Sequence, residues 1–523
     1  MPWLSILMAV PVLGAVGVSL VRSDKLAKQL ALAVSLVVLA LTGVVAARFD
    51  PNSETRFQFA EVYDWIPRFG VHYGVGVDGI ALVLIALSAV LVPIVILASW
   101  HDADGTVVTV PGEEPKTVAP KRSVKTYFAL LLVLEAMMIG VFAATDVFLF
   151  YVFFEAMLIP MYFMIGSYGG VQRSYAAVKF LLYSLFGGLL MLVAVIALYV
   201  VADQANGADP GTFMFPELIG VVQDPTTQKW LFAGFFIAFA VKAPLWPFHT
   251  WLPDAAAQAP AGAAVLLVGV LDKVGTYGML RFCLELFPSA SAFFTPLVIV
   301  LSVVGIVYGA IVAIGQTDMK RLIAYTSISH FGFIALGVFA MTREAGTGAT
   351  LYMVNHGFST GALFLIAGFL IYRRGSSQIA DYGGVQKVAP LLAGTFLIAG
   401  LSGLSLPGLS SFVSEFMVLM GSYRHHTVAA VIATTGVILA ALYILWMYQR
   451  TMTGPAAESV RALPDLNRRE IWVVAPLIAV IIALGFFPKP LLDVINPAVD
   501  KTLSNVQVDQ SSSAVAEKKG AGQ

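Results

Sequence analysis

Residues 230–253 read WLFAGFFIAFAVKAPLWPFHTWLP, an apolar run that ends in Lys242 and is followed at once by three prolines. A charge at membrane depth costs at least ~2.5–3.5 kcal/mol on insertion scales, so buried lysines in membrane proteins are usually functional. The prolines interrupt the helix and free backbone groups that lipid cannot satisfy. This stretch therefore predicts a membrane helix broken beside a buried charge, and it indicates an ion path.

The composition of the whole chain places this helix in a polytopic membrane protein. Of 523 residues, 59% are hydrophobic and 12% are charged, with 31 basic and 31 acidic side chains, which lies outside the range of soluble globular proteins. A membrane-spanning helix needs about 20 mainly apolar residues. The sequence predicts an all-α fold with about fourteen transmembrane helices, at residues 3–21, 29–47, 78–99, 126–144, 146–167, 175–201, 228–250, 262–287, 291–315, 321–341, 347–372, 390–424, 427–449 and 471–488.

A second predicted span is interrupted in the same style, by GLSLPG at residues 403–408, five helices after the first. A five-helix unit repeated in tandem must invert, and paired broken helices are the best sequence pointer to a transport site. We therefore expect two inverted five-helix repeats, although two unrelated proline kinks would give the same pattern. The expected domains are 1–124 (helices 1–3), 125–288 (helices 4–8), 289–455 (helices 9–13) and 456–523 (the final helix and a polar tail).

The loops predict the orientation. Lysines and arginines fall after the odd-numbered helices, whereas the loops 48–77 and 202–227 are acidic. By the positive-inside rule the basic loops are cytoplasmic. Both termini are therefore expected on the outer side of the cell membrane.

Buried charges lie in the first half of the predicted repeat. Glu155 is nine residues inside its span, so about 14 Å of helix separates it from Asp146, and the obvious cationic partner is Lys242. A fixed structural ion pair is the alternative to a functional one. Lys273 lies deep in its span beside Asp272, whose role the sequence leaves open, and a buried lysine can exchange a proton near neutral pH.

Other ionisable residues extend the series. His330, His356 and Glu415 lie in the second half, where imidazoles with hydroxyl neighbours can pass protons through water, although a lone histidine is more often a packing residue. Three further groups stay open between two readings: Lys179 between the path and snorkelling, Glu135 between the path and a subunit contact, and His249 with Asp254 between proton uptake and a structural cap.

Several functions are excluded by what the sequence contains. One cysteine, Cys283, rules out intrachain disulfides and Cys-ligated clusters, and the seven histidines lack metal-ligand spacing. A neutral chain without a basic tract has no footprint for nucleic acid. We expect no cofactor or metal in this chain, and membrane proteins, lipids and protons as its partners.

Six strings, in this order, resemble the antiporter-like membrane subunits of the proton-translocating NADH:quinone oxidoreductase, respiratory complex I. The likeness covers roughly residues 125–455. Glu415 departs from the L and N chains of that family and from the Mrp antiporters, which usually carry lysine there. Ala256, Gln258 and Asp272 depart from its commonest pattern. The strings are FYVFFEAMLIPMYFMIG (150–166), VKAPLWPFHTWLPDAAAQAP (241–260), DKVGTYGMLRF (272–282), DMKRLIAYTSISHFGF (318–333), NHGFSTGALFLIAG (355–368) and LPGLSSFVSEFMVLMGS (406–422).

The resemblance implies a fourteen-helix subunit of a bacterial inner-membrane complex. In it, Glu155 and Lys242 form the first pair, Lys273 is the central relay, His330 and His356 continue it, and Glu415 is the terminal site. NADH, FMN, iron–sulfur clusters and quinone would be held by other subunits, and L and N would be the neighbours. An Mrp-type Na⁺/H⁺ antiporter subunit and a membrane subunit of an energy-converting hydrogenase are the alternatives.

Overall fold

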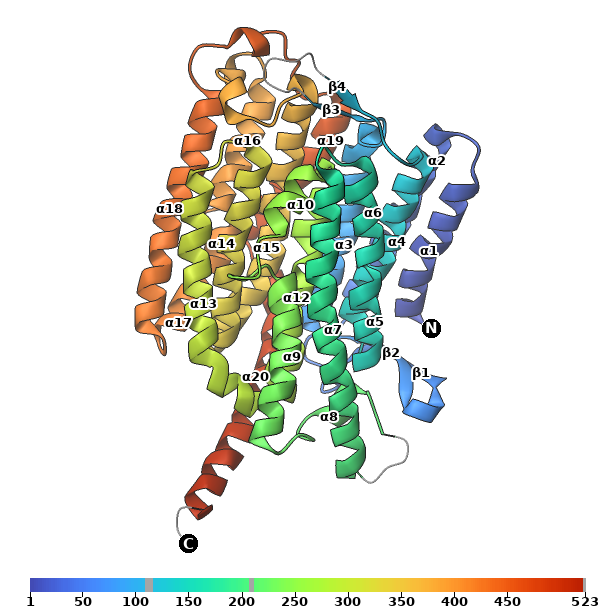
Figure 1. Cartoon of the computed structure of the whole chain (residues 1–523), viewed down its shortest axis with the longest axis vertical. Helices are drawn as coiled ribbons and strands as arrows, with labels where there is room; N and C mark the ends of the chain where they lie inside the picture. The colour runs from blue at the N-terminus through green and yellow to red at the C-terminus, as the bar shows by residue number, and fades with distance from the viewer. Residues whose placement is uncertain (109–115, 207–210, 521–523) are drawn as a thin grey trace.

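The protein folds as one upright bundle of helices (Figure 1). The computed structural model describes residues 1–108, 116–206 and 211–520, so the last three residues of the expected polar tail, 521–523, lie outside it. The helices are α1 (Trp3–Leu20), α2 (Asp24–Arg48), α3 (Gly79–Ala98), α4 (Val124–Ala143), α5 (Val147–Ala156), α6 (Leu158–Tyr168), α7 (Arg173–Asn206), α8 (Phe215–Leu218), α9 (Pro225–Lys242), α10 (Leu252–Gln258), α11 (Ala261–Leu266), α12 (Lys273–Gly278), α13 (Pro288–Ile314), α14 (Met319–Phe339), α15 (Arg343–Arg374), α16 (Pro390–Gly403), α17 (Ser410–Tyr423), α18 (Thr427–Met452), α19 (Arg468–Phe486) and α20 (Lys489–Gly520).

The predicted membrane class is confirmed. Among the described residues, twelve helices are long and apolar enough to cross a membrane. The two predicted spans that are not among the twelve are 228–250 and 390–424, the same two that the sequence predicts to be broken. In the first, α9 ends at Lys242, and the separate short helix α10 begins just beyond the predicted span; the second is divided into α16 and α17. The count of fourteen and the repeat stay predictions.

The two broken spans run in opposite directions through the bundle. The chain rises from α9 to α10 and descends from α16 to α17 (Figure 1). At the first break, the indole of Trp251 donates to the carbonyl of Val241 at 2.9 Å and so satisfies a group that the helix end leaves free. At the second, Gly408 has φ 90°, a conformation that glycine adopts without strain.

The centre of the bundle is one span that is not a regular helix. Residues 261–284 form α11, the π-helical turn η3 (Leu267–Leu271), α12 and the π-helical turn η4 (Met279–Leu284). Every residue of this span except Ala261 is buried, whereas fewer than half of the residues are buried in the most apolar parts of α7, α13 and α18. π-helical turns occur often at functional sites, and here they flank Lys273, the first residue of α12.

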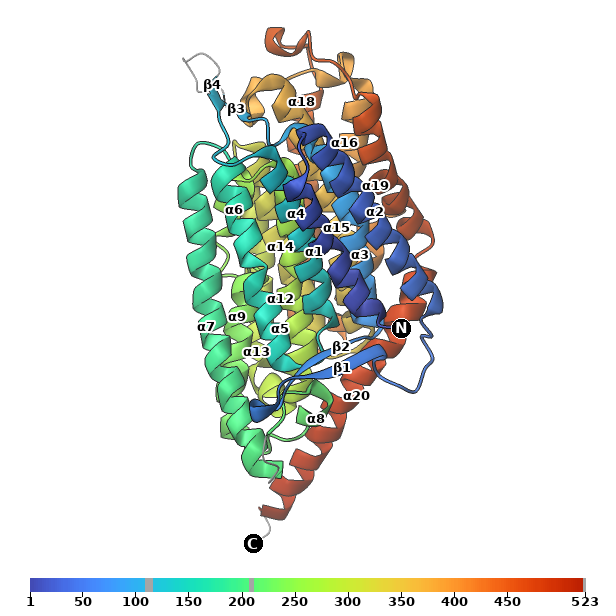
Figure 2. The same ribbon diagram turned by 90° about the vertical axis from the view of Figure 1, so that its right-hand side faces the viewer.

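The lower end of the bundle in Figures 1 and 2 carries structure that the sequence did not predict. Strands β1 (Gln58–Ile66) and β2 (Val71–Val77) pair as an antiparallel hairpin within the expected acidic loop. The polar C-terminal segment is helical, since α20 continues to Gly520. The start of α1 bonds to β1 through Leu4 N and Glu61, and Lys501 of α20 donates to Ser53 O at 2.7 Å. Both ends of the described chain therefore lie at one end of the bundle. A smaller hairpin, β3 (Thr106–Val108) with β4 (Lys116–Val118), lies at the other end.

Candidate functional site

Lys242 is the last residue of α9, and only 1% of its surface is exposed. Its Nζ lies 5.0 Å from the ring centre of Phe154 and 6.0 Å from that of Phe180, within the range of cation–π attraction. Among the residues that the structure describes, Nζ has no hydrogen-bond partner. The first break thus holds a buried ammonium group between aromatic rings.

Glu155 lies one residue before the end of α5 and is partly exposed. Its carboxylate packs on Gly188 of α7, where an added Cβ would overlap it. The preceding residue, Gly187, lies against Ala238 and Val241 of α9, at 3.1 Å and 3.4 Å from a Cβ built on it. Because Gly187 and Gly188 are adjacent, Glu155 and the end of α9 both pack against the same turn of α7.

The predicted pair of Glu155 and Lys242 is near but not in direct contact. Within the described part of the chain, one oxygen of Glu155 is buried without a hydrogen-bond partner, like the ammonium of Lys242. Glu155 and Asp272 are the two acids whose charge acts on Lys242. Two carboxylates therefore share the electrostatic influence on this lysine.

Asp272 is fully buried at the π-helical side of α12. Neither of its carboxylate oxygens has a partner among the described residues, although the charges of Lys273 and Lys242 both act on it. Gly275 explains why it is close to the first break, because a Cβ built there would lie only 2.7 Å from the backbone nitrogen of Ala243. The side chain whose role the sequence left open therefore belongs to a segment that packs against the end of α9.

Lys273 begins a line of contacts into the second half. Its Nζ donates to the carbonyl of Val268 in the π-helical turn and lies 2.6 Å from Nδ1 of His356 on α15. The rings of His356 and His330 meet edge to face with centres 5.2 Å apart. Both histidines are buried, so the predicted link from Lys273 to them corresponds to a chain of close neighbours.

Glu415 lies five residues after the start of α17 and is 5% exposed. Its carboxylate accepts hydrogen bonds from the hydroxyl of Tyr352 at 2.8 Å and from the hydroxyl of Ser405. Ser405 lies in the second break, and Tyr352 lies one turn before His356 on α15, with its ring centre 5.8 Å from that of His330. Tyr352 thus connects the histidines to Glu415.

Lys179 is held by an ion pair instead of lying free. Its Nζ is 2.7 Å from Asp254, whose other oxygen is 2.5 Å from Arg321 on α14. Asp254 therefore joins α7, α10 and α14 at the upper end of the bundle. This contact supports a structural role for Asp254 over a role in proton uptake. His249 is buried against the ring of Tyr308, and neither of its ring nitrogens has a partner among the described residues.

Glu135 stands apart from the other candidates. It lies on α4 with no exposed surface in this chain, and both carboxylate oxygens are without partners in the described structure. Glu135 is therefore buried within this chain. No charged neighbour acts on it within the described residues, so it is separate from the line through Lys273.

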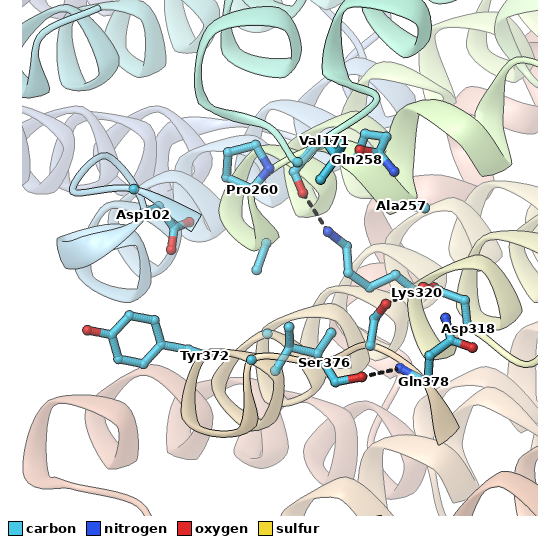
Figure 3. A pocket seen from close by; sticks show the side chains of 18 of the residues that line it. Asp102, Val171, Ala257, Gln258, Pro260, Asp318, Lys320, Tyr372, Ser376 and Gln378 are labelled. Carbon is cyan, nitrogen blue, oxygen red and sulfur yellow. Dashed lines mark hydrogen bonds between the residues drawn. The ribbon is translucent and has the colours of Figure 1, made fainter. Parts of the chain in front are cut away.

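A cavity of about 460 Å³ opens at the upper end of the central span (Figure 3). Pro260 and Ala261 line it at the start of that span, and Lys320 reaches into it and donates to Ala259 O at 2.6 Å. Asp102 lies on the opposite wall, and burial raises the pKa of its carboxyl despite bonds to Ser99 and the Gly262 backbone. The cavity offers room for water. Ala261, which lines it, precedes Lys273 by twelve positions in the same span.

Sequence reasoning missed Tyr352 and Ser405. The signal for Tyr352 is its spacing, since a residue four positions before His356 lies on the same face of a helix. Ser405 carries no such signal, because only the path of the second break turns it towards Glu415. Among the described residues, no group of three or more His, Cys, Asp or Glu side chains could hold a metal ion.

Comparison with known proteins gives consistent matches. Residues 144–441 match the family described as NADH:quinone oxidoreductase/Mrp antiporter, TM. The chain is 54% identical to NADH-quinone oxidoreductase subunit M of Mycobacterium tuberculosis, over 98% of this chain and 96% of that one. Two solved structures resemble it: a chain of respiratory complex I from Thermus thermophilus with bound NADH (TM-score 0.85, 30% identity, 96% of this chain and 99% of that one), and a chain of the Mrp complex from Dietzia sp. (TM-score 0.82, 20% identity, 97% and 98%). At 20% identity, the likeness to the Mrp chain shows a shared fold only.

Proposed function

Because this chain belongs to the membrane subunits that NADH:quinone oxidoreductases share with Mrp antiporters, we propose that it is subunit M of a respiratory complex I and moves protons across the membrane. The relative at 54% identity supports this function over the Mrp alternative, whose structural match is 20% identical. Glu415, where L, N and Mrp chains usually have lysine, agrees with type M.

The observation that carries the proposal is the buried line of Lys273, His356, His330, Tyr352 and Glu415. Its links are the 2.6 Å contact of Lys273 with His356, the adjoining imidazoles and the 2.8 Å bond from Tyr352 to Glu415. Amines, imidazoles, phenols and carboxylates can each take up and release a proton. A line of such groups across the membrane interior suits proton transfer better than a sodium site, which needs a cage of hard oxygen ligands.

In this proposal, the first half of the repeat supplies the proton to Lys273. Glu155 and Asp272 both stabilise the charge of Lys242, so displacing Glu155 weakens the hold on the lysine's proton. Asp272 then receives that proton and passes it to Lys273. A shift of one pKa unit in such a pair corresponds to about 1.4 kcal/mol, and nearby charges shift a pKa by about 1–3 units, which is enough to move a proton between neighbouring sites.

The finer assignments belong to the same proposal. The halves 125–288 and 289–455 are the inverted repeats, both termini lie on the outer side of a bacterial inner membrane, and L and N are the neighbouring subunits. NADH, FMN, iron–sulfur clusters and quinone act on other chains, so this one is a translocase without redox chemistry of its own. Lys179 and Glu135 stay outside the main line.

The test is NADH-driven acidification of inverted membrane vesicles that contain no other NADH dehydrogenase. Lys242→Ala is compared with wild type and with Lys489→Ala, a lysine whose side chain is 70% exposed. We expect an assembled complex that loses both acidification and NADH oxidation with Lys242→Ala, and normal behaviour with Lys489→Ala. Glu155→Gln, which removes a charge at nearly constant volume, should also reduce pumping sharply.

The opposite result would redirect the assignment. Normal NADH-driven acidification by Lys242→Ala would remove this lysine from the path and favour the antiporter or hydrogenase reading. Sodium-dependent acidification without NADH would identify the antiporter, and co-purifying hydrogenase chains would identify the third class.

A further inference from the structure

The face of the central span that carries Lys273 continues below it to the lower end of the bundle. Tyr277, Arg281 and Glu285 follow Lys273 at intervals of four residues, so they lie below it on one side of the span. Tyr277 and Arg281 are buried, with 1% and 3% of their surfaces exposed. The proton path proposed above turns aside at Lys273 and uses none of these three side chains.

Arg281 lies at the centre of this second line. Its guanidinium is 2.5 Å from the carboxylate of Asp78 and 3.6 Å from that of Glu285, and its Nε donates to the hydroxyl of Tyr277 at 3.3 Å. Asp78 precedes α3 and accepts from the backbone nitrogen of Ala81 at 2.9 Å. The guanidinium thus hydrogen-bonds Tyr277 on the side of Lys273 and Asp78 on the side of the lower surface, and it forms a looser ion pair with Glu285.

Fixed partners hold the acids in place. Glu285 accepts from Arg56, from the hydroxyl of Thr502 at 3.0 Å and from the amide of Asn505 at 2.9 Å. Thr502 and Asn505 belong to α20, the long helix that descends past the lower end (Figures 1 and 2). A buried cluster of two arginines and two acids therefore closes the space between Lys273 and the lower surface.

The other side of this cluster has room for water. Asp78 and Arg56 line a small cavity of about 10 Å³, together with Ser53, the exposed Thr55 and Lys501. A volume of that size holds about one water molecule. Along this line, the groups between Lys273 and the cavity are Tyr277, Arg281 and Asp78.

Only one of these three groups cannot relay a proton. A phenol and a carboxylate both donate and accept protons, whereas a guanidinium has no acceptor atom and does not lose its proton in proteins. The fixed positive charge of an arginine can also act as an electrostatic barrier that excludes protons from a water pore. Lys273 carries the transported proton in the proposed path, so an open line below it would lead that proton to the lower surface before it reaches Glu415.

We propose that Arg281, clamped between Asp78 and Glu285, is a proton-tight seal that separates Lys273 from the lower surface and so directs release through Glu415. This rests on the proposed function, because it requires that Lys273 carries the proton. Arg281 is a positioning residue in this role, since it blocks one route and takes no part in transfer along the other.

The test replaces the guanidinium with groups that can relay a proton. In the assembled complex, Arg281→Lys keeps the positive charge beside Asp78 but introduces an amine that can exchange a proton. We expect NADH oxidation to continue while acidification per NADH falls severalfold, because protons flow back from the lower surface through the opened line. Passive proton conductance under an imposed potassium diffusion potential, without NADH, should rise severalfold. Arg281→His provides a second relay-competent variant if the first does not assemble.

Two controls locate the leak. Arg343→Lys alters an ion pair with Asp500 whose side chains are 59% and 46% exposed, and it should leave both readings unchanged. Adding Lys273→Ala to Arg281→Lys should remove the extra passive conductance, because the leak starts at that lysine. Wild-type conductance and wild-type acidification per NADH in both Arg281 variants would overturn the seal. Failure of the wild-type vesicles to acidify would instead overturn the proposed function.

Discussion

Asp272 is the residue whose position changes the proposed path most. The resemblance to known subunits gives no role for an acid there, and the sequence alone leaves it open. In the structure it is fully buried, and the charges of Lys242 and Lys273 both act on it. A buried carboxylate without hydrogen bonds is costly to keep, and such groups are characteristic of proton-handling sites in membranes.

Replacing Asp272 with asparagine tests this role, because the amide keeps the shape and cannot carry a proton at neutral pH. We expect Asp272→Asn to reduce NADH-driven acidification at least severalfold, and Asp272→Glu to restore part of it. The measurement is the initial acidification rate of vesicles with equal amounts of assembled complex. Full activity of the asparagine variant would show that Lys242 and Lys273 exchange protons without this acid.

Tyr352 provides a second test at the same scale. Tyr352→Phe removes one hydroxyl and with it the 2.8 Å bond to Glu415, while the ring beside His330 stays. We expect slower pumping in an assembled complex, because the connection from the histidines to Glu415 loses its proton-carrying atom. Tyr372→Phe, at a side chain on the exposed upper surface, is the matched control. Equal rates in the two variants would exclude the phenol from the path.

At the scale of the elements, close helix packing sets the distances between the charged groups. Gly187 and Gly188 let α7 approach α9 and α5 at once, and Gly275 lets α12 approach the first break. Small residues at helix contacts are the usual means of close packing in membrane bundles. The glycines therefore position Glu155 and Asp272 around Lys242.

Gly188→Ala should displace the Glu155 carboxylate, since the added methyl group would occupy its place. We expect a folded complex with reduced pumping, because the acid moves away from Lys242 while its charge remains. Gly43→Ala on α2, where no atom lies within 4 Å of the added group, is the control for helix glycines in general. Acidification at the wild-type rate by Gly188→Ala would mean that this contact does not determine the function.

The elements also show where sequence reasoning succeeds and where it stops. Apolar runs and prolines are local signals, so they locate twelve confirmed spans and both broken ones. The π-helical turns η3 and η4 leave no comparable signal, because a π turn depends on packing against neighbours. α20 was missed because its polar composition lacks the apolar length that identifies a membrane helix.

At the scale of the whole molecule, partner choice is what the sequence could not predict. Buried charges in apolar runs are visible as single letters, and so Lys273, His330, His356 and Glu415 could be named in advance. The pairing of Lys179 with Asp254 joins residues 75 positions apart, and that of Arg281 with Asp78 joins residues 203 positions apart. Such contacts depend on the assembled bundle, and no periodicity along the chain reveals them.

α20 should contribute to the stability of the whole bundle through Glu285. Thr502→Val keeps the shape of a buried side chain but removes a hydrogen bond to this carboxylate. Hydrogen bonds to charged groups contribute about 1.5–3 kcal/mol, so the purified complex should unfold at a lower temperature. Ser504→Ala, at an exposed position on the same helix, should leave the unfolding temperature unchanged. Equal unfolding temperatures for the two variants would contradict a stabilising role for this contact.

The two π-helical turns on either side of α12 have a mechanical consequence. A π turn holds one more residue than an α turn, so moving that extra residue from η3 to η4 would shift the register of α12 alone. Such a shift rotates the segment by about 100° and slides it by about 1.5 Å, while both ends of the span stay fixed. Lys273 thus lies on a short helical segment that can rotate between two π-helical turns. One such shift of register would turn its amine away from His356.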